Sequence, residues 1–314
     1  MKILITGSTG LLGQALRRHL AQSCDVTGLS RSIPAGPAAE RHVVCDLRDA
    51  QRTRAVLREL QPDVVIHAQA LSDVDRCEQE PALANAMNAE TVANLAQALD
   101  ATRSTLVHLS TDYVFDGAKG SPYDELDAPH PISVYGRSKL EGERMALSYA
   151  ASVVIRPSTL FGPGRMNFCD HVVARVKAGR TVEAFIDQVT SPTYTEDLAE
   201  GIGQLLGVID RASITALPSR ILHLANDGSC SRYEFAQRIA ELLGASRAQI
   251  RAIRMAEQGR PAPRPPFSGL TTRYVPRLIG RRLRPWDEAF QAYLASTDRL
   301  HNIAPGAGSG WTGC

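Results

Sequence analysis

Two side chains one helical turn apart, Tyr135 and Lys139, are the first pair in the sequence with types and spacing suited to chemistry. Residues four apart share one face of a helix, so this spacing places a phenol beside an ammonium. A neighbouring cation favours the phenolate and makes the phenol a better proton donor near neutral pH. Such a donor suits a reaction in which a developing alkoxide takes up a proton. The Y-x-x-x-K pattern alone is weak, because many surface helices carry it by chance.

A hydroxyl upstream makes the pattern more specific. Residues 105–110 are predicted to form a strand, and Thr111 and Asp112 follow at its carboxyl end. Ligands of open parallel sheets bind at the carboxyl ends of central strands. There Thr111 can donate to a carbonyl oxygen while Tyr135 protonates it, and two donors on one oxygen are worth on the order of a few kcal/mol. Thr111, Tyr135 and Lys139 are therefore the predicted catalytic residues.

The chain begins with the pattern of a nucleotide-binding turn. An apolar strand at residues 2–6 leads into Gly7, Gly10 and Gly13, and helical spacing follows over residues 11–20. In this context the glycines let the backbone approach a pyrophosphate, and the free N–H groups of the helix N-terminus bind its phosphates. The alternative is an ordinary glycine-rich βα turn. The predicted contacts are Gly7, Gly10, Leu11, Leu12 and Gly13.

Three further segments are expected to contact the dinucleotide. The second strand (residues 24–29) ends without the acid that usually holds an NAD ribose. Arg31, which can bind a 2′-phosphate through its planar fork, favours NADPH over NADH, although it could be solvated. Asp46 is placed to accept from the adenine amino group, or else to cap a helix. The remaining predicted contacts with the cofactor are Leu47, Ala68, Gln69 and Ala70.

Strand and helix patterns alternate through the first half of the chain, which predicts an α/β fold with a doubly wound parallel (Rossmann) sheet. We expect a nucleotide-binding domain over residues 1–160, to which residues 181–226 partly return. Residues 161–298 would form a smaller C-terminal substrate-binding domain and residues 299–314 a mobile tail. One long helix is expected over residues 81–100. His67 is interpreted as a strand-end histidine rather than a base, and Asn88 either as a brace of the site or as a helix-face amide.

Composition excludes several classes of function. The 314 residues carry a formal net charge of +2, which gives no electrostatic case for nucleic acid. There is no apolar run long enough for a membrane span and no signal-peptide pattern at the N-terminus. The six cysteines show no C-x-x-C spacing, so we expect reduced thiols in a cytoplasmic protein and no metal site. The oligomeric state is left open, with a homodimer as the expectation.

Several segments resemble the extended short-chain dehydrogenase/reductases, and among them the dTDP-4-dehydrorhamnose reductase family. They are the glycine turn, S-T-D-Y-V-F-D-G at 110–117, V-Y-G-R-S-K-L-E-G-E at 134–143 and D-Q-V-T-S-P-T at 187–193. The resemblance covers residues 1–295. It implies NADPH-dependent reduction of the C4 keto group of a nucleotide-activated deoxysugar by Thr111, Tyr135 and Lys139. It also implies substrate contacts for Thr111, Asp112, Thr159 and Asn167, and a contact between Lys139 and the nicotinamide ribose.

Departures from the family pattern leave alternatives open. Gln69 stands where a small residue is usual, and residues 157–162 (P-S-T-L-F-G) lack the usual tryptophan and are closer to related epimerases. A nucleotide-sugar epimerase or epimerase-reductase is therefore one alternative. Another is a non-catalytic NADP-binding protein like the regulatory subunit of methionine adenosyltransferase. Arg165, Arg260 and Arg264 are candidates for a substrate diphosphate, or else solvated surface charge.

Overall fold

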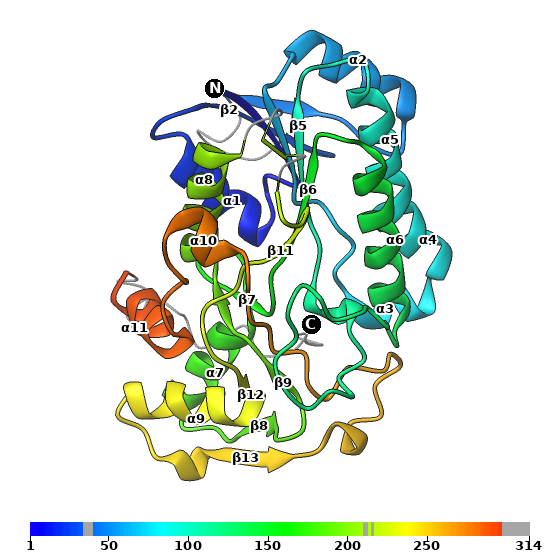
Figure 1. Cartoon of the computed structure of the whole chain (residues 1–314). Helices are drawn as coiled ribbons and strands as arrows, with labels where there is room; N and C mark the ends of the chain where they lie inside the picture. The colour runs from blue at the N-terminus through cyan, green and yellow to red at the C-terminus, as the bar shows by residue number, and fades with distance from the viewer. Residues whose placement is uncertain (34–39, 210–212, 215–216, 297–314) are drawn as a thin grey trace.

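The computed structural model of the chain describes residues 1–33, 40–209, 213–214 and 217–296. A seven-stranded parallel sheet lies between two layers of helices (Figure 1). The strand order is β11-β6-β5-β4-β1-β2-β3, so the chain winds outward in one direction from β1 and in the other from β4. This arrangement is the predicted doubly wound sheet, and its order reverses between β1 and β4. The strands are β1 (Lys2–Thr6), β2 (Asp25–Ser30), β3 (His42–Val44), β4 (Val64–His67), β5 (Thr105–Leu109), β6 (Ser152–Arg156) and β11 (Ile221–His223).

Helices cover both faces of the sheet (Figure 1). One layer contains α1 (Leu11–Leu20), α8 (Thr195–Val208) and α10 (Val275–Ile279), and α1 packs along α8. The other layer contains α2 (Ala50–Leu60), α3 (Val74–Gln79), α4 (Pro81–Asn85), α5 (Thr91–Leu99) and α6 (Val134–Ser148). Within it, α5 packs against both α2 and α6. Helix α8 and strand β11 join this core. The predicted division into domains, with residues 181–226 partly returning to the first, stays a prediction.

The central strands end level with one another. Thr6 of β1 pairs with His67 of β4, and His67 pairs with His108 of β5. All residues of β4 and β5 are buried, as expected for strands covered on both faces. The residues that follow these strands therefore meet at one edge of the sheet, where the glycine turn and Thr111 also lie.

A second hydrophobic core lies below this edge (Figure 1). Its largest side chains are aromatic, among them Phe161, Phe235 and Phe290, whose rings meet edge to face. Aromatic contacts of this kind add to the energy of area burial. The elements of this region are β7 (Leu160–Phe161), α7 (Phe168–Lys177), β8 (Val182–Phe185), β9 (Val189–Thr190), β10 (Thr193–Tyr194), β12 (Cys230–Ser231), α9 (Arg232–Leu242), β13 (Ile250–Ile253) and α11 (Trp286–Ser296).

One expected element differs in the structure. The helix predicted over residues 81–100 is interrupted by a π turn, η2 (Ala86–Glu90). Asn88 lies in this turn, and its amide exchanges hydrogen bonds with the backbone of Leu71 and donates to Ser138 Oγ. A π turn inside a helix changes the direction of side chains locally. Here it accompanies an inward amide that joins the segment after β4 to α6. A bracing role of Asn88 at the site stays a prediction.

Two further expectations concern the C-terminal tail and membrane-spanning helices. The tail predicted to be mobile, residues 299–314, lies outside the described residues. Within the described part of the chain, no helix is both long and apolar enough to cross a membrane.

Candidate functional site

The three predicted catalytic residues come from two elements that pack together. Thr111 follows β5 and caps the short 3₁₀ turn η3 (Asp112–Val114), where its hydroxyl accepts from Tyr113 N. Tyr135 and Lys139 lie in the first turns of α6, which contacts both β5 and η3. Lys139 Nζ donates to the carbonyl oxygen of Leu109, 2.6 Å away. The ammonium is therefore attached to the strand end that carries Thr111.

Local sequence explains why α6 begins so close to η3. Ser133 caps the helix by accepting from Gly136 N at 3.1 Å, and Glu78 of α3 accepts from Val134 N at 2.9 Å. A Cβ at Gly136 would lie 2.2 Å from the carbonyl oxygen of Tyr113. Glycine is thus needed for the close approach, and this approach places Tyr135 beside Tyr113, with ring centroids 5.7 Å apart.

Burial sets the electrostatics of Lys139, whose exposed fraction is 1%. Removal from water penalises the ammonium and lowers the pKa of Lys139 to about 8, while the carboxylate of Glu143 opposes the shift. Most of the Lys139 side chains in a population therefore carry a proton at neutral pH. A charged lysine at this position can hold a ribose hydroxyl and support a proton donor next to it.

His67 is not a base of this site. It is fully buried, its Nδ1 lies 2.7 Å from Thr6 Oγ1, and burial lowers its pKa to about 3. His108 stacks on it with ring centroids 5.4 Å apart, and burial lowers its pKa well below the usual value. Both imidazoles are therefore neutral at physiological pH.

The glycine turn has the geometry that a dinucleotide requires. Gly7 has a φ of +66°, and a Cβ there would lie 2.7 Å from the backbone of Gln69. At Gly13 a Cβ would lie 2.2 Å from the carbonyl oxygen of Gly7. Gly10 precedes α1 and places no side chain over the N–H groups of the first turn, which includes Leu11 and Leu12. The turn therefore presents bare backbone and a positive helix end to an anion.

Next to this turn, the segment Ala68, Gln69 and Ala70 follows β4 at the sheet edge. Gln69 Nε2 is buried and has no hydrogen-bond partner among the described residues. A buried donor of this kind normally has a partner, so its orphan state fits a cofactor lying across the edge. Arg31 is exposed just beyond β2, which leaves its guanidinium accessible to a 2′-phosphate. These assignments stay predictions.

The structure gives Asp46 and Leu47 partners inside the protein. Both carboxylate oxygens of Asp46 accept from Arg48, which lowers the pKa of this carboxyl group. Leu47 is fully buried, and its carbonyl oxygen accepts from Asn94 Nδ2. Neither contact is with a nucleotide, so the adenine contacts predicted for the two residues also stay predictions.

Three predicted substrate contacts lie around the end of β5 and the second core. Asp112 is buried and accepts from Ser158 Oγ and Ser268 Oγ, while burial raises its pKa. Asn167 caps α7 and donates to the carbonyl oxygen of Gly162. These bonds give Asp112 and Asn167 positioning roles within the protein. Thr159 is half-buried, and its hydroxyl lies 3.4 Å from a guanidinium nitrogen of Arg232.

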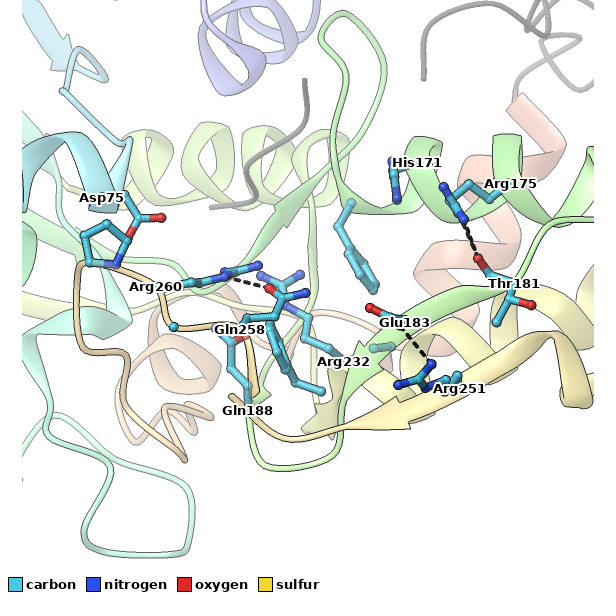
Figure 2. Close-up of a pocket in the computed structure, with 15 residues that line it drawn as sticks. Asp75, His171, Arg175, Thr181, Glu183, Gln188, Arg232, Arg251, Gln258 and Arg260 are labelled. Carbon is cyan, nitrogen blue, oxygen red and sulfur yellow. Dashed lines mark hydrogen bonds and ion pairs between the residues drawn. The ribbon is translucent and has the colours of Figure 1, made fainter. Parts of the chain in front are cut away.

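A cavity of about 720 Å³ lies beside the second core (Figure 2). Two arginines face it from different elements, Arg232 at the start of α9 and Arg260 in the loop after β13. The guanidinium groups lie 4.8 Å from the ring centroids of Phe168 and Phe185, which also line the cavity. Cationic forks and apolar rings in one cavity suit a ligand that has both phosphates and a flat base.

One residue of the cavity wall is connected to Tyr135 through the side chain of Tyr113. Gln188, which lines it, donates from Nε2 to Tyr113 Oη at 3.0 Å. The ring of Tyr113 in turn meets that of Tyr135 edge to face.

The sequence found only part of this cavity. Arg260 was predicted as a diphosphate ligand and lines the cavity, whereas Arg165 does not. The prediction for Arg264 is wrong, because its buried guanidinium donates to both carboxylate oxygens of Asp75. Arg232 was missed. Its one signal in the sequence was its position directly after Ser231, which caps α9.

A glycine turn between strand and helix, a doubly wound sheet, and a threonine, tyrosine and lysine at its carboxyl edge define an extended short-chain dehydrogenase/reductase. The family model described as the RmlD substrate binding domain matches residues 1–299, and the chain belongs to this family.

Individual relatives agree with this assignment. The chain is 35% identical to the spore coat polysaccharide biosynthesis protein SpsK of Bacillus subtilis, over 93% of this chain and 96% of that protein. It is 34% identical to the dTDP-4-dehydrorhamnose reductase of Mycolicibacterium smegmatis, over 94% of this chain and 85% of the relative. A crystal structure of dTDP-4-dehydrorhamnose reductase from Bacillus anthracis in complex with NADP superposes with a TM-score of 0.83. That structure is 30% identical and covers 94% of this chain and 99% of its own.

Proposed function

We propose that this protein reduces the C4 keto group of a dTDP-linked deoxysugar with NADPH, as a dTDP-4-dehydrorhamnose reductase does. The observation that supports the proposal is that Lys139, one helical turn after Tyr135 on α6, is bonded to the end of β5 that leads into Thr111. The names of the relatives and the NADP complex of a related structure support the substrate and the cofactor.

In this reaction NADPH, when bound along the glycine turn, supplies the hydride that adds to the sugar C4 carbon. Thr111 holds the carbonyl oxygen by donating a hydrogen bond from its hydroxyl. Tyr135 then gives its phenolic proton to the same oxygen, so the carbon gains a hydride and the oxygen a proton. Lys139 stabilises the tyrosinate left behind through its positive charge.

We propose that the substrate binds in the cavity beside the second core. The region around that core (residues 161–298) would then act as the substrate-binding domain. Arg232 and Arg260 would bind the diphosphate, and Phe168 and Phe185 would contact the base. We also propose a cytoplasmic location, since the described cysteines form no disulfide. The homodimer expected from the sequence stays a prediction.

The test is to follow NADPH absorbance while the purified protein is offered a dTDP-4-keto-6-deoxysugar. Steady oxidation of NADPH, with one hydroxyl formed at C4, supports the proposal. An epimerase would change the product without net NADPH consumption. Tight NADPH binding with no turnover of any 4-keto nucleotide sugar would indicate the non-catalytic alternative and contradict the proposal.

A further inference from the structure

A carboxylate and a guanidinium are buried together beneath the catalytic residues. Glu143 lies on α6 one turn beyond Lys139, and Arg156 ends β6; the exposed fraction of each side chain is 2%. Arg156 donates from Nε and Nη2 to the two carboxylate oxygens, at 2.7 and 2.6 Å. Removing both charges from water costs about as much as their attraction returns, and an apolar pair is often as stable. Stability alone therefore does not explain this pair.

The pair is attached to the strand end that carries the catalytic hydroxyl. Glu143 Oε1 also accepts from Ser110 Oγ, 2.5 Å away. Ser110 stands between two residues of the site. The one before it, Leu109, accepts from Lys139 Nζ through its carbonyl oxygen. The one after it is Thr111. Glu143 thus fixes the end of β5 onto the helix that carries the proton donor.

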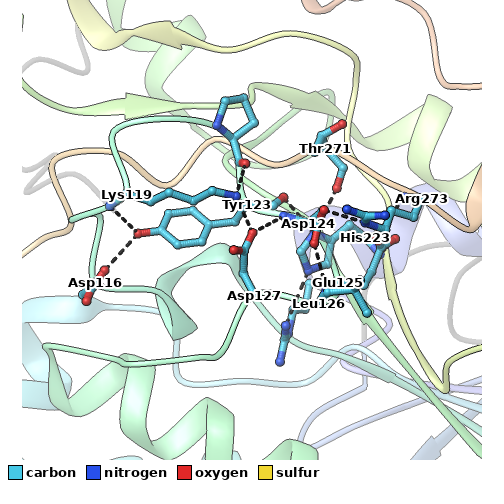
Figure 3. Close-up of polar contacts among 12 residues, drawn as sticks. Asp116, Lys119, Tyr123, Asp124, Glu125, Leu126, Asp127, His223, Thr271 and Arg273 are labelled. Carbon is cyan, nitrogen blue, oxygen red and sulfur yellow. Dashed lines mark hydrogen bonds and ion pairs between the residues drawn. The ribbon is translucent and has the colours of Figure 1, made fainter.

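On its other side Arg156 meets a neutral, fixed imidazole. Arg156 Nη1 lies 3.4 Å from His223 Nε2, while His223 Nδ1 lies 3.0 Å from the carbonyl oxygen of Thr271. Since a carbonyl only accepts, Nδ1 carries the proton and Nε2 accepts from Arg156. Burial lowers the pKa of His223 to about 4. Glu125 accepts from the backbone N–H of His223 (Figure 3), while the ring is held through Nδ1 by the carbonyl oxygens of Tyr123 and Thr271.

We propose that Glu143 and Arg156 are positioning residues of the catalytic site. Arg156 orients the carboxylate of Glu143. Glu143 in turn fixes the Leu109 carbonyl and the Thr111 hydroxyl relative to α6, and it keeps a negative charge one helical turn from the ammonium of Lys139. The kinetic part of this inference rests on the proposed function; the charge on Lys139 can be measured without it.

The electrostatic consequence has a definite sign. Burial lowers the pKa of Lys139, and Glu143 is the charged group that raises it. The two buried histidines nearest Lys139 are neutral. The other titratable groups on the elements packed against α6 are Arg156 of β6, Asp112 and Tyr113 of η3, Glu90 of η2, and Asp75, Arg76, Cys77 and Glu78 of α3. Removing the charge of Glu143 should therefore lower the pKa of Lys139 further, by about one pH unit.

The chain offers a clean way to measure this titration. It contains four lysines, Lys2, Lys119, Lys139 and Lys177, so the side-chain NMR signals of a lysine-labelled protein can be assigned with one Lys139→Met sample. The titration is then compared in the full-length protein and in Glu143→Gln, which keeps the shape of the side chain and removes its charge. If Glu143→Gln folds poorly, Glu143→Asp is used as a second variant. It retains the charge, so the pKa of Lys139 should stay close to that of the unmodified protein.

A matched control comes from the opposite helix layer. Asp197 on α8 is likewise held by two bonds from one guanidinium, that of Arg284, at 2.8 and 2.5 Å. Asp197→Asn removes a paired carboxylate away from the catalytic residues. A merely structural role for Glu143 predicts that Glu143→Gln and Asp197→Asn lower thermal stability alike and leave the Lys139 titration in place.

The expected result is a Lys139 titration about one pH unit lower in Glu143→Gln and unchanged in Asp197→Asn. With a 4-keto sugar nucleotide, the alkaline limb of the kcat profile should move by the same amount in Glu143→Gln, a loss of about tenfold above the limb. A Lys139 titration that does not move in Glu143→Gln overturns the inference. Absence of turnover in the unmodified protein would instead count against the proposed function, and the NMR result would still decide this one.

Discussion

Replacing Gly13 by alanine should damage the proposed cofactor site specifically. The new Cβ would lie 2.2 Å from the carbonyl oxygen of Gly7, whereas ordinary contacts lie at 3.4–4 Å. Helix α1 and the glycine turn must then separate by at least the difference, about 1.2 Å, and overpacking of this kind costs about 1–3 kcal/mol. A shift of that size takes backbone N–H groups out of reach of a phosphate.

The loss of binding can be worked out from hydrogen bonds to charged groups, each worth about 1.5–3 kcal/mol. Losing one such bond weakens NADPH binding by about 10- to 150-fold, since 1.4 kcal/mol is a factor of ten. Binding is measured by titration calorimetry on Gly13→Ala and on the control Gly207→Ala.

Gly207 also lies in a helix, but its Cβ would meet no atom within 4 Å. The control should therefore bind NADPH normally and gain about 0.5–1 kcal/mol of stability. If Gly13→Ala binds NADPH as tightly as Gly207→Ala, the glycine turn does not hold the pyrophosphate and the reasoning is refuted.

Other changes have distinct expected outcomes. Tyr135→Phe should lower turnover by about 10²–10⁴-fold with NADPH binding unchanged in calorimetry, and near-normal turnover would remove Tyr135 as the proton donor. Arg232→Ala should raise KM for the nucleotide sugar by roughly tenfold or more at similar kcat; an unchanged KM would place the diphosphate elsewhere. Arg31→Ala should weaken NADPH but not NADH in paired titrations, and equal losses would contradict a 2′-phosphate contact. In a pH profile, kcat/KM should be retained below about pH 8 and lost above it. The reason is that burial lowers the pKa of Lys139 to about 8, so the ammonium loses its proton above this pH. A flat profile up to pH 10 would contradict this role of Lys139.

Features that depend on neighbouring residues in the chain could be predicted from the sequence. Such features include the first strand (residues 2–6), the spacing of Gly7, Gly10 and Gly13, and the spacing of Tyr135 and Lys139. Each of them depends only on residues a few positions apart in the sequence. Because parallel strands end at one edge, even the meeting of Thr111 with these groups follows from the order of elements.

Pairing across distant segments could not be predicted. Arg264 and Arg260 are similar in sequence context, yet Asp75 takes up Arg264 and leaves Arg260 facing the cavity. The choice depends on how α3 packs against the loop after β13, which no local pattern encodes. The same holds for Glu143 and Arg156, whose partnership requires α6 and β6 to be in contact.

The most direct test of the central claim follows a deuterium atom. The protein is incubated with a dTDP-4-keto-6-deoxysugar and NADPH deuterated at nicotinamide C4, and the product is examined by NMR and mass spectrometry. The account predicts one deuterium on the sugar C4 carbon, which bears the new hydroxyl, and loss of this transfer in Tyr135→Phe. A product without deuterium at C4, or one changed only at neighbouring carbons, would contradict it.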